Sequence, residues 1–325
     1  MFPQEAMEYF LHSKLFEGHT YGYTPKGLWD DILSGIRGQM ILFYKKWYQP
    51  KNAKAFCYGR GDYINECLDI LDQAITNFEE PKEEEFGVSL PGDSKIQFRK
   101  LDDITGNIQE RQAYPSFQTE KDYRMGISWV LNDSTMDSRT EVAWFLIKEL
   151  LVGSHTAIIP KAVEKYGDDF IGHLDSDLQQ WVLTMGVTGL PKEGDAHKAE
   201  QDIYNALKLI SQNGFDKDAL KAATNIVEFR LRDLNSKCGM PQGANMFKKV
   251  LSKWNYDLDP RLALSWYTDF VQLKADLEDP DNTESNEFLL ELVTKYLLDN
   301  TAKSSVVLYP STSMQTDARN VRSKS

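Results

Sequence analysis

Five histidines, at positions 12, 19, 155, 173 and 197, are the side chains of this chain best suited to metal or acid–base chemistry. No two of them lie four residues apart, the spacing that places two imidazoles on one helical face to share a metal ion. His12 and His19 flank Glu17, but they lie on either side of a predicted helix end, which does not favour a metal cluster. His173 with Asp175 and Asp177 is typical of a solvated turn rather than a set of ligands.

Nucleophilic and phosphate-binding chemistry find no better support. A catalytic nucleophile needs a base and a sharply defined turn, whereas Cys57 lies in an apolar run that predicts a buried strand. The cysteines at positions 57, 67 and 238 form no CxxC pair and leave at least one thiol unpaired, which indicates a reducing compartment. Gly59-Arg60-Gly61 is too short to be a phosphate-binding loop. No catalytic, cofactor-binding or metal-binding residue is therefore assigned.

Composition bounds the fold and the partners. The 325 residues suffice for one and a half to two domains, and 41% hydrophobic and 26% charged residues are typical of a globular protein. A net charge of −12 argues against a nucleic-acid or anionic-membrane partner, since both require clustered Lys and Arg. No run approaches the roughly 18 apolar residues of a membrane span. The N-terminal stretch resembles neither a transit peptide nor a secretory signal, and is expected to lie inside a domain.

The first 80 residues are expected to form an incomplete α/β layer. Apolar residues recur at helical spacing before and after a short apolar run at 53–58, which predicts a strand with helices on either side. A lone strand needs neighbours, so the opening strands are missing and this part should be the least stable. Residues 81–95 are acidic and broken by Pro and Gly, and are interpreted as a linker between domains.

The rest of the chain predicts a second domain over residues 96–310, followed by a disordered tail at 311–325. Strand patterns come first and long helices later, which is typical of α+β architecture, with the apolar run 124–131 as the central strand. Asp137 and Asp216 are positioned to cap helices. The remaining predicted strands are 95–101, 108–114, 181–189 and 305–309, and the predicted helices are 142–153, 158–166, 199–214, 220–234, 246–254, 259–277 and 284–298.

Three groups of residues carry a family resemblance. They are Thr20-Tyr21-Gly22 with the spacing to Trp47–Ala53, the helix end Glu228-Phe229-x-Leu231-Arg232, and Gly239-x-Pro241-x-Gly243 followed by Lys253-Trp254-x-Tyr256-Asp257-x-Asp259-Pro260. Together they resemble the presequence-protease branch of the pitrilysin/insulinase zinc metallopeptidases over nearly the whole chain. The chain departs from the family pattern where Met240 and Gln242 replace a Phe and an Arg, and where Lys26–Trp29 replaces a Gly-Gly-Asp-Pro turn.

The resemblance implies two insulinase-type layered domains, each a mixed sheet packed against helices, the first one incomplete. It also implies a zinc endopeptidase that degrades short unstructured peptides, such as cleaved targeting presequences, in the mitochondrion (matrix) or a plastid. In that family a His-x-x-Glu-His motif and a distant Glu bind the zinc, and both lie upstream of the stretch that matches Met1. No histidine here is followed by Glu-His at that offset. The chain alone is therefore expected to bind no zinc, to be inactive, and to need the missing halves of the peptidase chamber as well as a peptide substrate.

By the same resemblance, Gly153 and Ser154 are candidates to contact the N-terminus of a peptide. The alternative, which the residues favour, is a glycine that ends a helix. An alternative function is a non-catalytic scaffold or partner subunit of an organellar complex, and a third is a truncated gene model with no function of its own.

Overall fold

The structure, a computed structural model, describes residues 3–23, 37–78, 98–104, 109–115, 122–233, 242–279 and 282–311. The chain divides into two compact units: unit 1 is Met1–Tyr23, Phe98–Asp233 and Val250–Ser325, and unit 2 is Thr24–Gln97 and Leu234–Lys249. The predicted linker at 81–95, the glycine–proline corner at 239–241 and residues 312–325 of the predicted tail lie outside the described residues. No described helix is long and apolar enough to cross a membrane.

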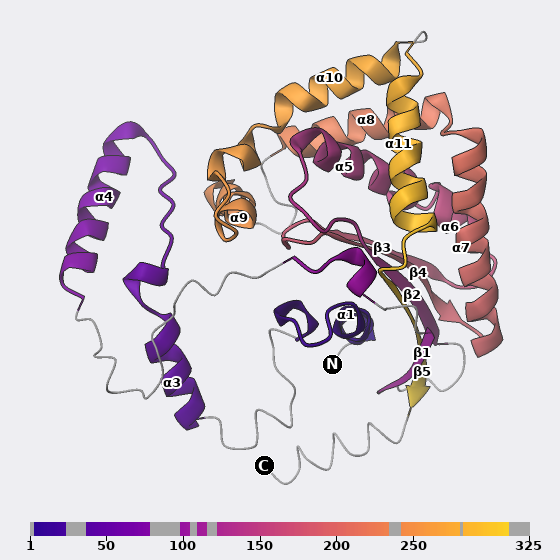
Figure 1. The fold of residues 1–325 in the computed structure, drawn as a ribbon, viewed down its shortest axis with the longest axis horizontal. Coiled ribbons are helices and arrows are strands. Elements are labelled where there is room, and N and C mark those ends of the chain that lie inside the picture. Colours follow the sequence, from indigo (N-terminus) through magenta and orange to yellow (C-terminus); the bar gives the residue numbers. More distant parts are fainter. Residues whose placement is uncertain are drawn as a thin grey trace. The chain divides into compact units, whose positions relative to one another are not determined.

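Unit 1 is built on a five-stranded mixed sheet with the strand order β1-β5-β2-β4-β3 (Figure 1). β1 runs parallel to β5 and every other neighbouring pair is antiparallel. The predicted α+β class is confirmed, and the predicted central strand 124–131 is the central β2. The strands are β1 Gln109–Pro115, β2 Tyr123–Val130, β3 Asp169–Asp175, β4 Val182–Leu190 and β5 Lys303–Ser311.

Helices cover one face of the sheet in two layers. Alternate side chains of each strand point to that face, where they pack against the helices. Met125, Ile127 and Trp129 of β2 belong to the main core, which also includes buried residues of these helices. The covering elements are α5 Ser138–Val152, α6 Ile158–Val163, α7 Glu193–Asn213, α8 Lys217–Arg232, α10 Trp266–Glu278 and α11 Glu284–Val293, the last continued by a π-helix at Thr294–Leu298.

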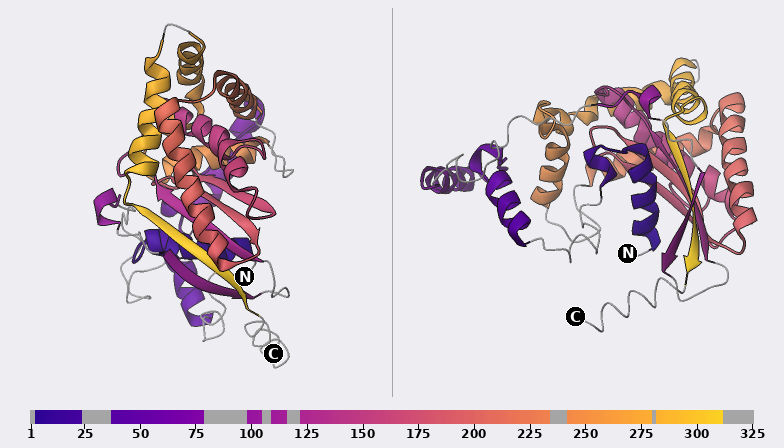
Figure 2. Two further views of the ribbon diagram at one scale, coloured as in Figure 1. Left: turned by 90° about the vertical axis from the view of Figure 1, so that its right-hand side faces the viewer. Right: turned by 60° about the horizontal axis from the view of Figure 1, so that its bottom comes forward.

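The opposite face of the sheet is covered by α1, Pro3–Leu15 (Figure 2). Met7 and Leu11 are buried with Val306 and Leu308 of β5 in a separate apolar cluster. The compact units therefore divide the chain differently from the predicted boundary at 81–95, since residues 3–23 belong with the sheet. Helical periodicity located this helix but could not show which sheet it would cover.

Three strand predictions need correction. Residues 53–58 form no strand, because no described strand of unit 2 lies beside them to complete a ladder. Within the predicted strand 95–101, Arg99 instead exchanges both of its backbone hydrogen bonds with the side-chain amide of Gln180, at 2.9 Å each. The predicted solvated turn around His173 is wrong, because His173 and Asp175 lie in the edge strand β3, in which most residues are half-buried.

The predicted helix caps are confirmed. The side chains of Asp137 and Asp216 accept hydrogen bonds from the backbone N–H of Thr140, at 2.7 Å, and of Ala219, at 2.9 Å. The aromatic–acidic stop after α9, Gln242–Trp254, is a Schellman motif: Leu258 N–H donates to the Lys253 carbonyl and Asp257 N–H to the Trp254 carbonyl. Asp257 accordingly has a φ of 59°.

Unit 2 contains α3 Arg37–Trp47, a 3-10 turn at Pro50–Asn52, α4 Gly61–Thr76 and the first part of α9. Phe56 stacks on Phe247 at 5.4 Å, and Tyr58 donates a hydrogen bond to Gln242. No residue of α4 is buried, although its apolar residues share one helical face. Its exposed large apolar side chains are Tyr63, Leu68, Ile70 and Ile75.

A carboxylate between two imidazoles links α1 to the edge strand. Asp175 lies 3.3 Å from Nε2 of His12 and 2.7 Å from Nε2 of His173. Burial opposes ionisation of Asp175, but the two histidines outweigh it and hold the pKa of Asp175 well below its usual range. The same contact raises the pKa of His173; Glu8 adds to this rise and Lys148 opposes it.

The antiparallel pairing of β2 with β4 predicts a stability difference between two alanine variants. Gly126 lies directly opposite Gly186. A Cβ on Gly186 would lie 2.1 Å from the Met125 carbonyl oxygen, whereas a Cβ on Gly126 meets only the movable end of Met7 and a methyl of Leu11. We expect Gly186→Ala to lower the free energy of unfolding by about 1–3 kcal/mol and Gly126→Ala by less than about 1 kcal/mol. Urea unfolding of both variants checks this, and equal losses would contradict it.

The link between α1 and β3 also predicts a pH dependence. The raised pKa of His173 adds stability that is complete below the ordinary value of 6.5 and is lost as the pH rises through the folded-state value. The lowered pKa of Asp175 adds stability that is complete above 3.8 and is lost as the pH falls. Between about pH 5.5 and about pH 8, wild type should lose a few tenths of a kcal/mol more than His173→Gln, a small effect because His173 is exposed. Parallel urea titrations with identical losses would contradict the assignment.

Candidate functional site

Two of the sequence motifs meet at one end of the sheet. The hydroxyls of Tyr21 and Tyr256 lie 2.5 Å apart, and the backbone N–H of Gln179 donates to the Tyr21 hydroxyl at 2.9 Å. Burial and the Tyr256 hydroxyl together raise the pKa of Tyr21 far above its usual value. The motif tyrosines therefore stay neutral and join the segment after α1 to the segment after α9.

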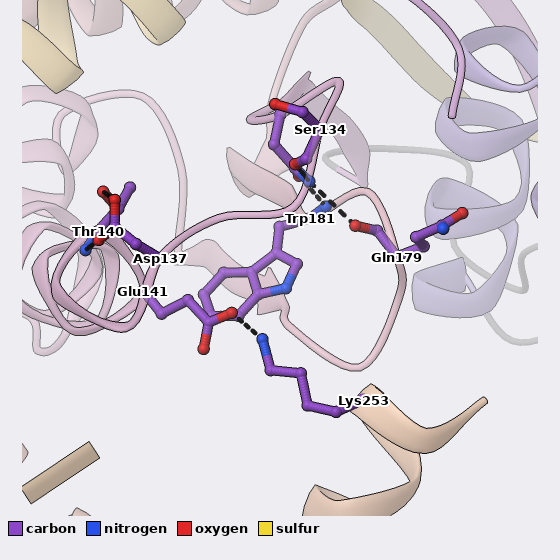
Figure 3. Close-up of polar contacts among 8 residues, drawn as sticks. Ser134, Asp137, Thr140, Glu141, Gln179, Trp181 and Lys253 are labelled. Atoms are coloured by element: carbon purple, nitrogen blue, oxygen red, sulfur yellow. Dashed lines mark hydrogen bonds and ion pairs between the residues drawn. The ribbon is translucent and has the colours of Figure 1, made fainter. Parts of the chain in front are cut away.

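The same end of the sheet contains an ion pair between Lys253 and Glu141 beside the indole of Trp181 (Figure 3). Asn132 connects the neighbouring loops. Its side-chain oxygen accepts from the backbone N–H of Trp181 at 2.7 Å, and its side-chain nitrogen donates to the Gln179 carbonyl at 3.0 Å. The cavity among these groups holds about 20 Å³, room for a water molecule but for no substrate. This cluster orders loops and offers no reacting pair.

A more accessible surface lies where α5 ends. Gly153 was predicted as a helix-ending glycine or a peptide contact, and it is the C-cap of α5, with φ −73° and ψ −25°. That conformation suits any residue, so a left-handed backbone is not the reason for glycine here. A Cβ at Gly153 would instead lie 2.3 Å from the Glu149 carboxyl and 2.4 Å from the Glu149 carbonyl oxygen. Glycine fits here because a side chain would meet both the buried carboxyl and the helix backbone.

The loop that follows, residues 153–157, is fixed against the edge strand. A Cβ on Gly172 of β3 would lie 2.5 Å from Cβ of Val152, so the last turn of α5 rests on the strand at that glycine. The ring of His155 packs edge-on against Phe170, with the ring centroids 5.1 Å apart. The loop and β3 thus form one continuous surface.

This loop–strand surface presents groups that can bind an extended chain. Among the described residues β3 pairs only with β4, so its outer edge offers backbone donors and acceptors. Ser154 and Thr156 are exposed, and their hydroxyls lie 3.0 Å from each other. An unpaired strand edge beside a polar loop is the arrangement by which peptides add to a sheet.

Of the other residues considered from the sequence, the structure brings His12, His173 and Asp175 together and leaves His19 apart from them. His19 accepts a hydrogen bond from the Tyr21 N–H, and His12 and His173 both contact Asp175. Within the described ranges, no three His, Cys, Asp or Glu side chains are grouped to hold a metal ion. Cys57 is half-buried rather than a core residue, and Cys67 is exposed.

Sequence reasoning did not assign a role to Glu149, which lies under the loop. Its side chain is 4% exposed and pairs with Arg230 of α8. A charged residue inside the apolar helical pattern of Leu146 and Leu150 was the available signal, because a buried carboxylate needs a partner. Phe170 gave no such signal, since the edge strand that carries it was missed.

Known proteins match the chain over most of its length. It is 26% identical over 314 residues to presequence protease 1, chloroplastic/mitochondrial, of Arabidopsis thaliana, covering 95% of this chain and 28% of that protein. It is 28% identical over 269 residues to the mitochondrial presequence protease of Yarrowia lipolytica, covering 79% of this chain and 25% of that protein. A protease from Helicobacter pylori shares the fold, with a TM-score of 0.71 and 17% identity over 95% of this chain and 67% of that one.

These matches cover only part of each relative. The chain spans between a quarter and a third of the length of these two curated relatives. The family model described as the peptidase M16 inactive domain matches residues 36–227, more than half of the chain. The chain therefore belongs to the peptidase M16 family, through the family's inactive-domain model.

Proposed function

We propose that this chain is a peptide-holding part of an M16-type peptidase that does not itself hydrolyse peptides. The observation that carries the proposal is the loop–strand surface of unit 1. There the loop 153–157, with Ser154 and Thr156 exposed, packs against one face of the edge strand β3 through the His155–Phe170 contact. Main-chain hydrogen bonds along a strand edge hold a peptide without regard to its sequence, which suits the disposal of varied, unstructured peptides. Gly153 and Ser154 would contact the end of such a peptide.

Hydrolysis would need residues from elsewhere. The 325 residues contain no His-x-x-Glu-His, so the two imidazoles and the general base of that zinc motif must come from other polypeptide. The curated relatives are more than three times as long as their matched region, which supports a larger enzyme around this part. Zinc would then belong to the complete enzyme, and this chain alone would bind none at a catalytic site.

The exposed apolar face of α4 supports the need for further polypeptide. Tyr63, Leu68 and Ile75 are each more than half exposed, and no residue of α4 is buried. Soluble proteins seldom leave such a helical face uncovered. Strands of a more complete first domain, pairing with residues 53–58 and packing on α4, are the occupant proposed for this face.

The cellular location follows from the relatives alone. The two curated relatives described above are named as mitochondrial or chloroplastic presequence proteases. We therefore propose an organellar location, and short peptides such as cleaved targeting presequences as the substrate class. A scaffold or partner subunit would share the exposed α4 face, but it would need no peptide surface at β3.

Peptide binding distinguishes these functions. A fluorescein-labelled, unstructured peptide of about 15 residues should bind the full chain with a Kd of about 1–100 μM and protect residues 153–157 and 169–175 from hydrogen exchange. A matched peptide with N-methyl groups on alternate amides should bind at least about tenfold more weakly, since it cannot complete a ladder. Equal binding of both peptides, or protection confined to other segments, would contradict the proposal.

A further inference from the structure

We propose that Glu149 is a positioning residue for the loop–strand surface, acting through its ion pair with Arg230. The inference rests on the proposed function and adds a mechanism to it: a buried carboxylate sets where the loop 153–157 lies beside β3. Glu149 touches no peptide itself. Its effect on binding passes through the backbone at Gly153.

The first step is that the buried Glu149 carboxylate is held by Arg230. The Glu149 side chain is 4% exposed, and both oxygens of its carboxylate accept hydrogen bonds from the Arg230 guanidinium, the longer at 3.2 Å. Lys148 lies 3.8 Å from the same carboxylate. A paired guanidinium fixes a carboxylate in two directions at once, because the fork of donors matches its two oxygens. The position of Glu149 is therefore tied to α8.

The second step is the contact between this carboxylate and the loop. Gly153 lies so close to the Glu149 carboxyl that even a methyl group would overlap Cδ and Oε1 at 2.3 Å. The N–H of Gly153 also donates to the Glu149 carbonyl at 2.9 Å. The last turn of α5 is thus wrapped around the side chain, and a carboxylate released from Arg230 would turn and push on the backbone at Gly153.

The third step connects Gly153 to the strand. Val152, the residue before it, packs on Gly172 of β3, and His155, two residues after it, packs on Phe170. A shift at Gly153 changes both contacts, because they lie on either side of it. The ion pair between α5 and α8 is therefore coupled to the spacing between the loop and β3.

A double-mutant cycle tests the coupling in the full chain. The variants are Glu149→Gln, Arg230→Gln and the two combined, with Arg230→Lys as the conservative replacement. Lys274→Gln is the matched control. Lys274 of α10 forms a 2.7 Å ion pair with Glu228 of α8, and this pair does not include Glu149. Each variant is measured for its melting temperature, for hydrogen exchange at 153–157, and for the Kd of the fluorescein-labelled peptide, at a temperature where circular dichroism shows it folded.

The expected result is that Glu149→Gln and Arg230→Gln each weaken peptide binding about tenfold and speed exchange of the loop, while the double variant is no weaker than either single one. Arg230→Lys should restore part of the affinity, and Lys274→Gln should leave the Kd unchanged even where it lowers the melting temperature. Suppose that the wild type binds the peptide. The positioning role alone would then be overturned if Glu149→Gln bound as tightly as the wild type, or if Lys274→Gln bound as weakly as Glu149→Gln. A wild type that binds no peptide would overturn the proposed function and this role with it.

Discussion

The close approach of two backbones, where the end of α5 rests on β3, is the constraint on which the functional surface depends. Gly172 admits Val152 against the strand, and Gly153 admits the Glu149 carboxyl beneath the loop. In each place a Cβ would overlap a backbone carbonyl oxygen as well as a side chain, that of Val152 at Gly172 and that of Glu149 at Gly153. Glycine at these two positions therefore allows the exposed polar loop to pack closely against β3.

The two units differ in how completely they bury their apolar surface. Unit 1 fills both faces of its sheet, with helices in two layers on one side and α1 on the other. Fully burying a large apolar side chain contributes about 1.5–3 kcal/mol, so α1, with Met7, Leu11 and Leu15 buried, is held far more by packing than by Asp175. Unit 2 has no comparable core among its described residues. The apolar face of its amphipathic helix α4 stays exposed among the described residues.

Much of unit 1 could be predicted from local patterns. The apolar run 124–131 located β2 and helical periodicity located α5, and Asp137 and Asp216 were recognised as caps because capping is decided within four residues. Predictions failed where pairing decides the structure. Residues 53–58 look like a strand but have no strand beside them among the described residues. Residues near Arg99 pair with the Gln180 side chain, and β3 is a strand because β4 lies beside it. At the site, Gly153 was identified, but the reason for it is Glu149, which lies four residues earlier and was assigned only to the helix.

The account separates holding a peptide from cutting it. In the proposed function, binding uses a strand edge and a loop of unit 1, whereas hydrolysis would use a His-x-x-Glu-His zinc motif, which these 325 residues do not contain. The most direct measurement is mass spectrometry of an unstructured peptide recovered after incubation with the purified chain and added zinc. The account predicts that the peptide co-elutes with the chain and is recovered intact. Recovery of cleavage products whose formation a chelator abolishes would contradict it.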